Sequence, residues 1–566
     1  MTPFWFIVLA LVAYGIAYLW YSKWYDRNVW KSDPAKTTPA HMFMDGVEFF
    51  PSSRYVLWGY QFKSIAALGP ILGPWIAVTY GWLPALIWII VGNFFIGWIH
   101  DYGSIMLTVR NEGKSFGPLT YEWVGAGGRN TLLGFLLFYL LIISAVFIMF
   151  IALFWNIFPG TIWATLGMIV TGLIAGQLLY KMKMNILTVT IISIVLVVVS
   201  VFLGVWFPFP ATGFLGAWTL AFWAAVLCVI LYIASMLPMP TFIQPVNYVA
   251  FYPAFIGVLL IIIGSLLSPV TNITLLQPAW KTAYSAAAGP IWPMMFVAIA
   301  CGAISGWHSL VGSSATGKQL DIETDAHPVG AGAMLTEGLL ALAALAAFMV
   351  LAPDETALGN VGGFVTGATR LTTAYLGAGT ETFLKVFFGL FLVIYAFTVQ
   401  TLVTRFWRMI SAELFGESAL GQPVVSTIVG LSIAWLFAIS GSWINLWLYF
   451  GGANQLLAGL ALMLISIYLV RLRARSGFTL GPAIFMIVTT LAALAWETWM
   501  FLRALVTRAP LVRAPLASYP TIALAINGIF VLVGAALFIL GIRMALLTWG
   551  SYSKYRAAPP AEAPAE

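Results

Sequence analysis

Charged residues are scarce in this chain of 566 residues. Asp, Glu, Lys and Arg together make up 8% of the sequence, whereas 61% of the residues are hydrophobic. A typical soluble domain carries about 25% charged residues. Because so few charges cannot cover a surface in water, we expect lipid to surround the chain. The 25 Trp and 22 Tyr agree with this, since their rings favour the membrane interface.

Several signatures of other protein classes are also missing. The two cysteines, Cys228 and Cys301, lie in apolar stretches and indicate neither a disulfide framework nor a zinc site. The four histidines lack the H-E-x-x-H spacing of a metalloenzyme, and no Gly-x-x-x-x-Gly-Lys-Ser/Thr loop supports an ATP-driven pump. The net charge is +7, but the basic residues fall between apolar runs and form no patch interleaved with aromatic residues. The sequence therefore favours neither an enzyme nor a nucleic-acid-binding protein, and no cofactor is expected.

Long apolar runs dominate what is present. A membrane-spanning helix needs roughly 20 apolar residues. The candidate spans lie at 3–21, 56–80, 83–109, 131–157, 161–180, 186–207, 216–236, 249–268, 291–315, 330–352, 383–404, 424–440, 443–470, 480–503 and 520–547. We therefore predict an all-α integral membrane protein with about fifteen transmembrane helices.

The sequence also makes predictions for the N-terminal run, the long connections and the C-terminal tail. The first run has neither a basic start nor a small-residue cleavage site, so we expect a retained helix rather than a signal peptide. The connections 22–54 and 353–382 are predicted to be loops, and the tail at 548–566 is predicted to be disordered.

Lysine and arginine in the short connections indicate the orientation. Basic residues follow the first, third, fifth, eleventh and thirteenth runs, whereas the connections 81–82, 158–160, 208–215 and 441–442 contain none. Cytoplasmic loops are the basic ones, so we expect the N-terminus outside the cell and the C-terminus in the cytoplasm. The connection 504–519 departs from this pattern, because it contains Arg508 and Arg513.

Proline and glycine interrupt one of the runs near its middle. The segment 56–80 contains Gly69-Pro70 and Gly73-Pro74. Each proline lacks an N–H group, so the carbonyl groups of Ala66 and Pro70 are predicted to lose their helical partners. The alternative is that these prolines only kink the helix.

A second proline-rich stretch, 234–245, lies five spans later. Broken helices at corresponding positions of two five-helix units indicate a transporter binding site. We therefore predict a ten-helix inverted-repeat core over 56–411, built from units 56–207 and 216–411. Residues 1–55 would precede this core with one extra helix and a cytoplasmic loop, and four helices over 412–547 would follow it.

Short motifs are spread over most of this predicted core and one following helix. They are P-A-H-M-F-M-D-G at 39–46, the segment 51–55, the two Gly-Pro pairs, Asp101, N-E-G-K-S at 111–115, I-S-G-W-H-S-L-V at 304–311, K-Q-L at 318–320, D-A-H-P-V-G at 325–330 and G-G-A-N-Q-L-L at 451–457. Together they resemble the carbon starvation protein A family of bacterial and archaeal transporters. The resemblance implies uptake of peptides, or of a small carboxylate such as pyruvate, across the cell membrane and driven by a cation gradient. It also implies the leucine-transporter type of inverted repeat.

Three positions depart from the family pattern near the expected binding site. The family usually has two histidines where this chain has Tyr60-Gln61, alanine where it has Lys63, and an aspartate near Thr401. The substrate therefore stays open between a peptide, a small carboxylate, an amino acid and another small solute.

Ionisable residues within the spans are functional candidates, because a charge at membrane depth is costly. Lys63 could pair with a carboxylate of the substrate or of Asp101, or extend toward the cytoplasmic side. Asp101 matches the family and is predicted to couple or gate transport, with a helix–helix hydrogen bond as the alternative. His100 lies about 100° from it around the helix, so the two are not expected to share a face. His308 also matches the family and could bind substrate, relay a proton or make a structural hydrogen bond.

Small polar residues line the run 291–315. Ser313-Ser314 is an adjacent hydroxyl pair, and the carbonyl group of Leu310 lies three residues before it. These oxygens, with the freed carbonyl groups of Ala66 and Pro70, could bind a sodium ion. The resembling fold carries such a hydroxyl pair on its eighth core helix, which corresponds to this run. The alternative is close helix packing by small residues.

The predicted function is cation-coupled secondary transport by alternating access, with a channel less favoured because no ring of like side chains repeats. Substrate is expected at Gln61, Lys63, Gly69, Gly73, Asp101 and His308, where half-helix N-termini favour a carboxylate. Proton coupling through Asp101 or His308 is the alternative to sodium. The expected partners are the substrate and membrane lipids, with no nucleic acid. Asn454 and Gln455 are interpreted as interhelical hydrogen-bonding residues or as a contact in a homo-oligomer.

Overall fold

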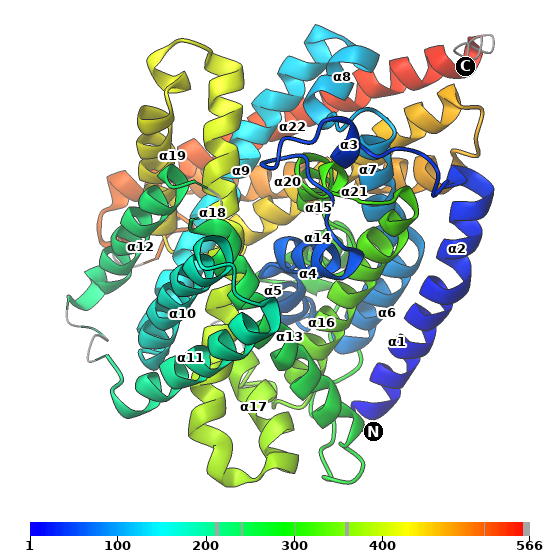
Figure 1. The fold of residues 1–566 in the computed structure, drawn as a ribbon. Coiled ribbons are helices and arrows are strands. Elements are labelled where there is room, and N and C mark those ends of the chain that lie inside the picture. The colour runs from blue at the N-terminus through cyan, green and yellow to red at the C-terminus, as the bar shows by residue number, and fades with distance from the viewer. Residues whose placement is uncertain are drawn as a thin grey trace.

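The computed structural model describes residues 1–209, 213, 215–238, 241–299, 301–356, 362–513 and 516–558. Helices dominate these ranges (Figure 1), and a short antiparallel hairpin joins β1 (Tyr284–Ser285) to β2 (Gly289–Pro290). The helices of the first half are α1 (Phe4–Ile16), α2 (Ser22–Tyr25), α3 (Pro39–Met42), α4 (Arg54–Ile65), α5 (Gly69–Ala77), α6 (Trp82–Gly92), α7 (Trp98–Val109), α8 (Phe116–Val124), α9 (Ala126–Ile157), α10 (Gly160–Gly176), α11 (Ile186–Trp206), α12 (Thr219–Met236) and α13 (Ile243–Leu266). Those of the second half are α14 (Ile291–Ala298), α15 (Gly306–Ser314), α16 (Gly332–Met349), α17 (Gly363–Leu376), α18 (Glu381–Phe415), α19 (Pro423–Ala438), α20 (Trp443–Arg471), α21 (Gly477–Val506) and α22 (Pro520–Ala557).

Twelve helical segments within the described ranges are long and apolar enough to cross a membrane. Each corresponds to one of the predicted spans. The three other predicted spans are 56–80, 291–315 and 424–440, and they correspond to the pair α4–α5, the pair α14–α15 and the shorter helix α19. The chain is therefore a multi-pass membrane protein, as its apolar runs predict.

Burial separates a central group of helices from a peripheral one. In α20 every residue of the most apolar stretch is buried, and in the segment Ala378–Phe415 that share is 94%. The shares for Phe4–Trp30 and Ile186–Trp206 are 22% and 28%. We infer that the first two segments lie in the protein core and that the last two face lipid, because apolar side chains left uncovered by protein need an apolar solvent.

The first proline-rich run is interrupted where the sequence predicts it. Helix α4 ends at Ile65, Ala66 has an extended backbone with ψ of 107°, and α5 begins at Gly69. Pro70 lies in the first turn of α5, where a missing N–H group is tolerated. It cannot supply the N–H group that the carbonyl of Ala66 would need in a continuous helix.

The second predicted break is wrong in position. The stretch 234–245 runs from the end of α12 into the first turn of α13, so Pro238 lies between two helices and Pro245 lies in the first turn of the second one; Pro240 falls outside the described residues. The carbonyl groups of Ser235 and Leu237 accept hydrogen bonds from Arg408 and Arg405. Prolines suit such a connection, because no helical N–H group is required there.

The interruption lies instead within the predicted span 291–315. Helix α14 ends at Ala298 and α15 begins at Gly306, and the described residues between them form turns rather than helix. No proline occurs from 294 to 314. The local signal is a small-residue sequence, Gly302 followed by Ser305 and Gly306, because glycine lowers helix stability by about 1 kcal/mol relative to alanine.

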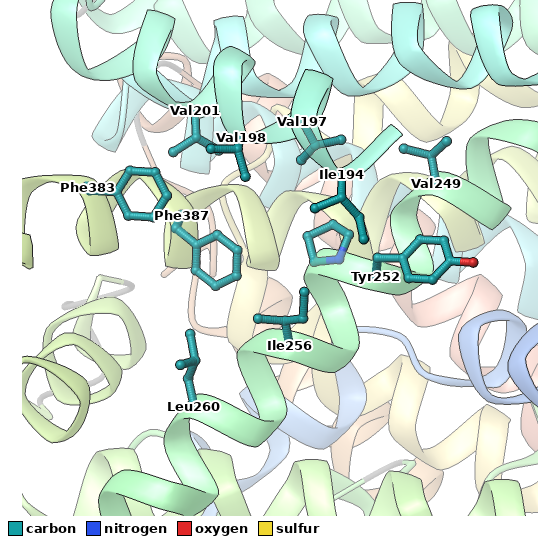
Figure 2. Close-up of a pocket in the computed structure, with 11 residues that line it drawn as sticks. Ile194, Val197, Val198, Val201, Val249, Tyr252, Ile256, Leu260, Phe383 and Phe387 are labelled. Atoms are coloured by element: carbon teal, nitrogen blue, oxygen red, sulfur yellow. The ribbon is translucent and has the colours of Figure 1, made fainter. Parts of the chain in front are cut away.

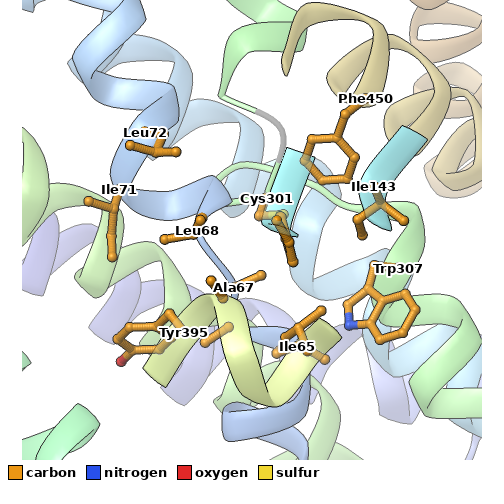
Figure 3. Close-up of a cluster of buried hydrophobic side chains, with 14 of the residues drawn as sticks. Ile65, Ala67, Leu68, Ile71, Leu72, Ile143, Cys301, Trp307, Tyr395 and Phe450 are labelled. Carbon is orange, nitrogen blue, oxygen red and sulfur yellow. The ribbon is translucent and has the colours of Figure 1, made fainter. Parts of the chain in front are cut away.

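The two interruptions lie against each other at close range. A Cβ atom on Gly69 would come within 2.4 Å of the sulfur of Cys301, and one on Gly73 within 2.7 Å of the Cα atom of Ile299. Figure 3 shows Cys301 beside Ala67 and Leu68 of the first interruption. Glycine at positions 69 and 73 is therefore required for backbone approach between the two interrupted helices.

Three other segments differ from the prediction. The first helical segment continues to Trp30, so part of the expected loop 22–54 is helical. The expected loop 353–382 contains α17. Helix α22 continues to Ala557 and includes the first part of the predicted tail, whereas residues 559–566 lie outside the described ranges.

Candidate functional site

A chain of four ionisable side chains lies in the protein interior, beside the second interruption. His100 Nδ1 lies 2.8 Å from Asp101 Oδ1, and His308 Nδ1 lies 2.9 Å from Asp101 Oδ2. The other ring nitrogen of His308, Nε2, lies 2.9 Å from Oε2 of Glu337. All four side chains have 0% exposure. They come from α7, α15 and α16, so three helices meet at this point.

His100 and Asp101 depart from the expectation that neighbouring helical residues do not share a face. Their Cβ atoms do diverge around α7, but the imidazole ring bends back to the carboxylate at 2.8 Å. Asp101 thereby accepts from two histidines, one on each oxygen. Two donors on one buried carboxylate stabilise its ionised form, because each replaces a hydrogen bond that water would supply.

Short π-helical turns precede two of the helices that carry the chain. Asn93–Gly97 precedes α7, and His327–Ala331 precedes α16. Such turns change the helical phase and occur frequently at functional sites. Asn93 links the first of these turns to the second interruption and to α16, because its Nδ2 donates to the carbonyl groups of Gly302 and Met334 at 3.3 and 3.0 Å.

Helix α20 satisfies the backbone groups that the second interruption leaves free. Gln455 Nε2 donates to the carbonyl of Ile299 at 2.9 Å, and Trp447 Nε1 donates to that of Ala298 at 3.0 Å. Asn454 Oδ1 accepts from the backbone N–H of Trp307 at 2.9 Å. A buried backbone group without a partner is costly in lipid, so these side chains hold the interrupted shape. Asn454 and Gln455 therefore make the interhelical hydrogen bonds predicted for them.

Lys63 is buried without a carboxylate partner. Its Nζ donates to Thr398 Oγ1 at 2.6 Å and lies 4.7 Å from the centre of the Tyr395 ring, and both partners belong to α18. In the described part of the chain no carboxylate oxygen comes within ion-pair distance of it. The alternative that Lys63 pairs with Asp101 is therefore wrong. The ammonium group has three donors, so this contact with one hydroxyl and one ring leaves donors for a further partner.

Gln61 contacts a different part of the protein from Lys63. Its Oε1 accepts from Thr316 Oγ1 at 2.5 Å, just beyond the end of α15. Its Nε2 is buried and, among the described residues, has no hydrogen-bond partner. Because residues two apart lie on opposite sides of a helix, Gln61 and Lys63 point to opposite sides of α4.

The predicted sodium ligands are placed as follows. Ser313 and Ser314 are the last residues of α15, and Leu310 is buried one turn before them. Pro70 lies against Gly302, a residue of the second interruption, with its Cα atom 3.7 Å from a Cβ built there. The Oγ atom of Ser313 is buried and finds no hydrogen-bond partner in the described ranges.

Three donor atoms in the same region converge closely enough for a metal ion. They belong to Cys301, His308 and Glu337 and lie within 4.8 Å of one another. Two ligands on a tetrahedral zinc ion, each about 2.1 Å from the metal, would be about 3.4 Å apart. The 2.9 Å between His308 Nε2 and Glu337 Oε2 is shorter, so this contact matches an ion pair between the two side chains better than a shared metal ion.

An apolar pocket of about 150 Å³ lies apart from this polar centre. Figure 2 shows it between α11, α13 and α18, with Val197, Ile256 and Phe387 among its walls. Its lining is almost wholly hydrocarbon, so it offers nothing to a charged or strongly polar solute.

The family is settled by comparison with known proteins. The family description "Carbon starvation protein CstA" matches residues 2–362 and 354–493. The chain belongs to the carbon starvation protein CstA family. This confirms the resemblance carried by the sequence motifs.

Individual relatives of this CstA-family chain are named as transporters. It is 28% identical over 542 residues to the "Peptide transporter CstA" of Bacillus subtilis (strain 168), covering 87% of this chain and 90% of that protein. It is 31% identical over 372 residues to the "Pyruvate/proton symporter BtsT" of Escherichia coli (strain K12), covering 62% of this chain and 50% of that one. Among solved structures, that of MhsT in complex with L-phenylalanine matches with a TM-score of 0.46 and 13% identity, over 87% of this chain and 99% of that chain.

The sequence predicts two of the four members of the buried chain in this CstA-family protein, Asp101 and His308, which contact each other. His100 is not expected to lie on the same side as Asp101, yet it joins the chain. Glu337 was not a candidate, although it is the one acidic residue of the apolar run 330–352. That isolation is a usable signal, since acidic residues in membrane spans are rare and usually functional. Thr398 and Tyr395 carry no such signal, because hydroxyls and rings are common in membrane helices.

Proposed function

We propose that this protein is a secondary active transporter that takes up a small carboxylate-bearing solute, a peptide or pyruvate, together with protons. The observation that carries the proposal is the buried chain His100–Asp101–His308–Glu337. Its four groups are fully shielded from solvent, and each lies within hydrogen-bond or ion-pair distance of the next. Chains of acidic and histidine side chains inside a membrane protein are typical of proton relays.

His308 is the group best placed to accept and release the proton. It lies between the carboxylates of Asp101 and Glu337, 2.9 Å from each. Asp101 holds Nδ1 of the ring, so Nε2 is left to face Glu337. The contact with Glu337 is not aligned as a linear hydrogen bond, and both carboxylate oxygens of Glu337 lack another partner among the described residues. A small ring rotation or helix movement at this contact would therefore change which group holds the proton.

Lys63 supplies the positive charge for the substrate carboxylate in this proposal. It lies two residues before the end of α4, and Gly69 and Gly73 lie in α5 beyond the first interruption. The N-terminus of α5 adds a favourable dipole for an anion. Two relatives support the substrate class, since one is named a peptide transporter and another a pyruvate/proton symporter.

Alternating access would use the two interrupted helices as the moving pair. Helix α5 packs on α14, and α9 packs on α18. Helix α13 packs on α4, α16 and α18, and α20 packs correspondingly on α14, α7 and α9. This correspondence supports an inverted repeat whose halves begin at α4–α5 and at α14–α15, so the second half begins at residue 291 rather than at 216.

The test is uptake of labelled pyruvate and of a labelled dipeptide into liposomes that contain the purified protein. An inside-alkaline pH gradient without sodium should drive accumulation above the equilibrium level. The variant Glu337→Gln should lose this accumulation but keep exchange of labelled for unlabelled substrate, because exchange needs no net proton movement. Accumulation by Glu337→Gln at the wild-type level would overturn the proton pathway, and substrate entry without exchange stimulation would indicate a channel.

Sodium is the second candidate for the coupled ion. The unpartnered Oγ of Ser313 is the observation that favours it. Replacing Ser313 and Ser314 together by alanine should abolish any sodium dependence of uptake. Uptake that stays sodium-coupled in this double variant would exclude the predicted site at Ala66, Pro70, Leu310, Ser313 and Ser314.

A further inference from the structure

A cleft of about 830 Å³ lies between the first helical segment, α4 and α16. None of the four buried ionisable residues lines it, and neither does Lys63. Its lining residues on the first segment are Leu11, Tyr14, Gly15 and Tyr18, which recur at i, i+3, i+4 and i+7 and so share one face. Gly332, Leu335, Thr336 and Leu339 of α16 repeat the same spacing. The cleft therefore has two helical walls that lie side by side, each about two turns long, and the space between them is elongated.

The cleft is polar at one end and apolar at the other. The stacked rings of Tyr18 and His327, with centroids 4.8 Å apart, mark the polar end. Leu11 and Leu339 lie at the other end, where the two walls run in opposite chain directions. Tyr18 and Leu11 are seven residues apart, which corresponds to about 10 Å along a helix. The space thus has the length and polarity gradient of a lipid segment that runs from headgroup to hydrocarbon.

The polar end carries one charge of each sign in a loose pair. Arg54 Nη1 lies 3.9 Å from Asp325 Oδ1, at the limit of an ion pair, and the Arg54 side chain is 53% exposed. At that separation each group can take a closer partner of its own. A guanidinium binds phosphate in a bidentate manner, and a carboxylate accepts hydrogen bonds from an ammonium.

We propose that this cleft binds one phospholipid whose zwitterionic headgroup carries a primary ammonium. The phosphate lies at Arg54, the ammonium lies at Asp325, and an acyl chain lies between Leu11 and Leu339. The first helical segment is itself mostly lipid-exposed, so a lipid can enter from the side. Tyr14, Tyr18 and Trp58 also line the cleft, and amphipathic rings of this kind favour the headgroup region.

Gly15 offers a variant that fills the cleft without strain. It lies within α1, and no atom comes within 4 Å of a Cβ built on it. Gly15→Phe should therefore occupy the lipid space and leave the helix intact. Gly528→Phe is the matched control, because Gly528 lies within α22 and also has nothing within 4 Å of its Cβ position.

The experiment counts lipids on the intact protein. The purified full chain is equilibrated with an equal mixture of phosphatidylethanolamine and phosphatidylglycerol, and retained lipid is measured by native mass spectrometry. We expect one phosphatidylethanolamine to be retained preferentially, at least tenfold less of it on Gly15→Phe, and no change on Gly528→Phe. Asp325→Asn should remove the preference between the two lipids, because only phosphatidylethanolamine carries an ammonium group for Asp325 to hold. Arg54→Gln should lower the retention of both lipids, because both carry a phosphate.

Equal retention of phosphatidylethanolamine by Gly15→Phe and the wild type would overturn the proposal. If Gly15→Phe also lost dipeptide or pyruvate binding, the cleft would instead be a passage for the transported solute. The lipid count does not depend on transport. A negative lipid result therefore leaves the proposed proton pathway untouched, and a negative transport result leaves the proposed lipid site untouched.

Discussion

His308 Nδ1 lies 2.9 Å from Asp101 Oδ2, although the two residues are 207 positions apart in the chain. This contact joins α15, which follows the second interruption, to α7. Asp101 is also held by His100, so its carboxylate cannot turn away without losing a second contact. The relationship fixes which nitrogen of His308 faces Glu337, and it makes the position of the second interruption part of the proposed coupling site.

The variant Asp101→Ala tests how strongly this contact stabilises the fold. It leaves two buried histidines without their shared acceptor. Breaking a buried charged pair by removing one partner typically lowers the free energy of unfolding by about 3–5 kcal/mol. The thermal unfolding midpoint in detergent should fall accordingly. Glu413→Ala is the control, because its pair with Arg129 is about one-third exposed and such pairs contribute about 1 kcal/mol or less. Equal shifts in the two variants would contradict a stabilising role for Asp101.

Gly73→Ala tests the close approach of the interrupted helices. The added methyl group would meet the Cα atom of Ile299 at 2.7 Å, which only a backbone shift can relieve. Overpacking of this kind costs about 1–3 kcal/mol. We expect a lower unfolding midpoint and slower substrate exchange.

Gly59→Ala is the matched control for this prediction. Its Cβ would meet only the Phe251 ring, at an ordinary contact distance of 3.6 Å. If Gly73→Ala and Gly59→Ala had the same unfolding midpoint and the same exchange rate, close contact between the interrupted helices would not be needed for stability or for exchange.

The sequence predicts the first interruption better than the second for a physical reason. At Ala66 the cause is local, because Pro70 removes the N–H group that the carbonyl of Ala66 needs. At 299–305 the stabilising partners are distant, since Gln455 donates to Ile299 from 156 positions away. The candidate site shows the same contrast between local and distant causes. Asp101 and His308 lie in recognisable motifs, whereas Glu337 does not. Its contact with His308 appears only when α16 is placed beside α15.

Gln455→Leu tests whether α20 maintains the second interruption. The substitution keeps the approximate size of the side chain but removes the donor to the carbonyl of Ile299. A buried acceptor left without a partner costs about 1–3 kcal/mol. We expect the free energy of unfolding to fall by this amount. Gln422→Leu is the control, because Gln422 is exposed and lies just before the first residue of α19. An unchanged stability would mean that the interruption holds its shape without this hydrogen bond.

Lys63→Met tests the proposed anchor for the substrate carboxylate. Methionine keeps most of the length and the apolar stem of lysine but removes its charge and its hydrogen bond to Thr398. The KM for pyruvate or a dipeptide should rise at least tenfold, which corresponds to about 1.4 kcal/mol of binding free energy. Lys385→Met is the control, since that lysine forms an exposed pair with Glu381 on α18. Binding of an uncharged ester of the same substrate should change little in either variant, because it has no carboxylate for Lys63 to hold. If Lys63→Met lowered the affinity for ester and acid equally, Lys63 would support the shape of the site rather than bind the carboxylate.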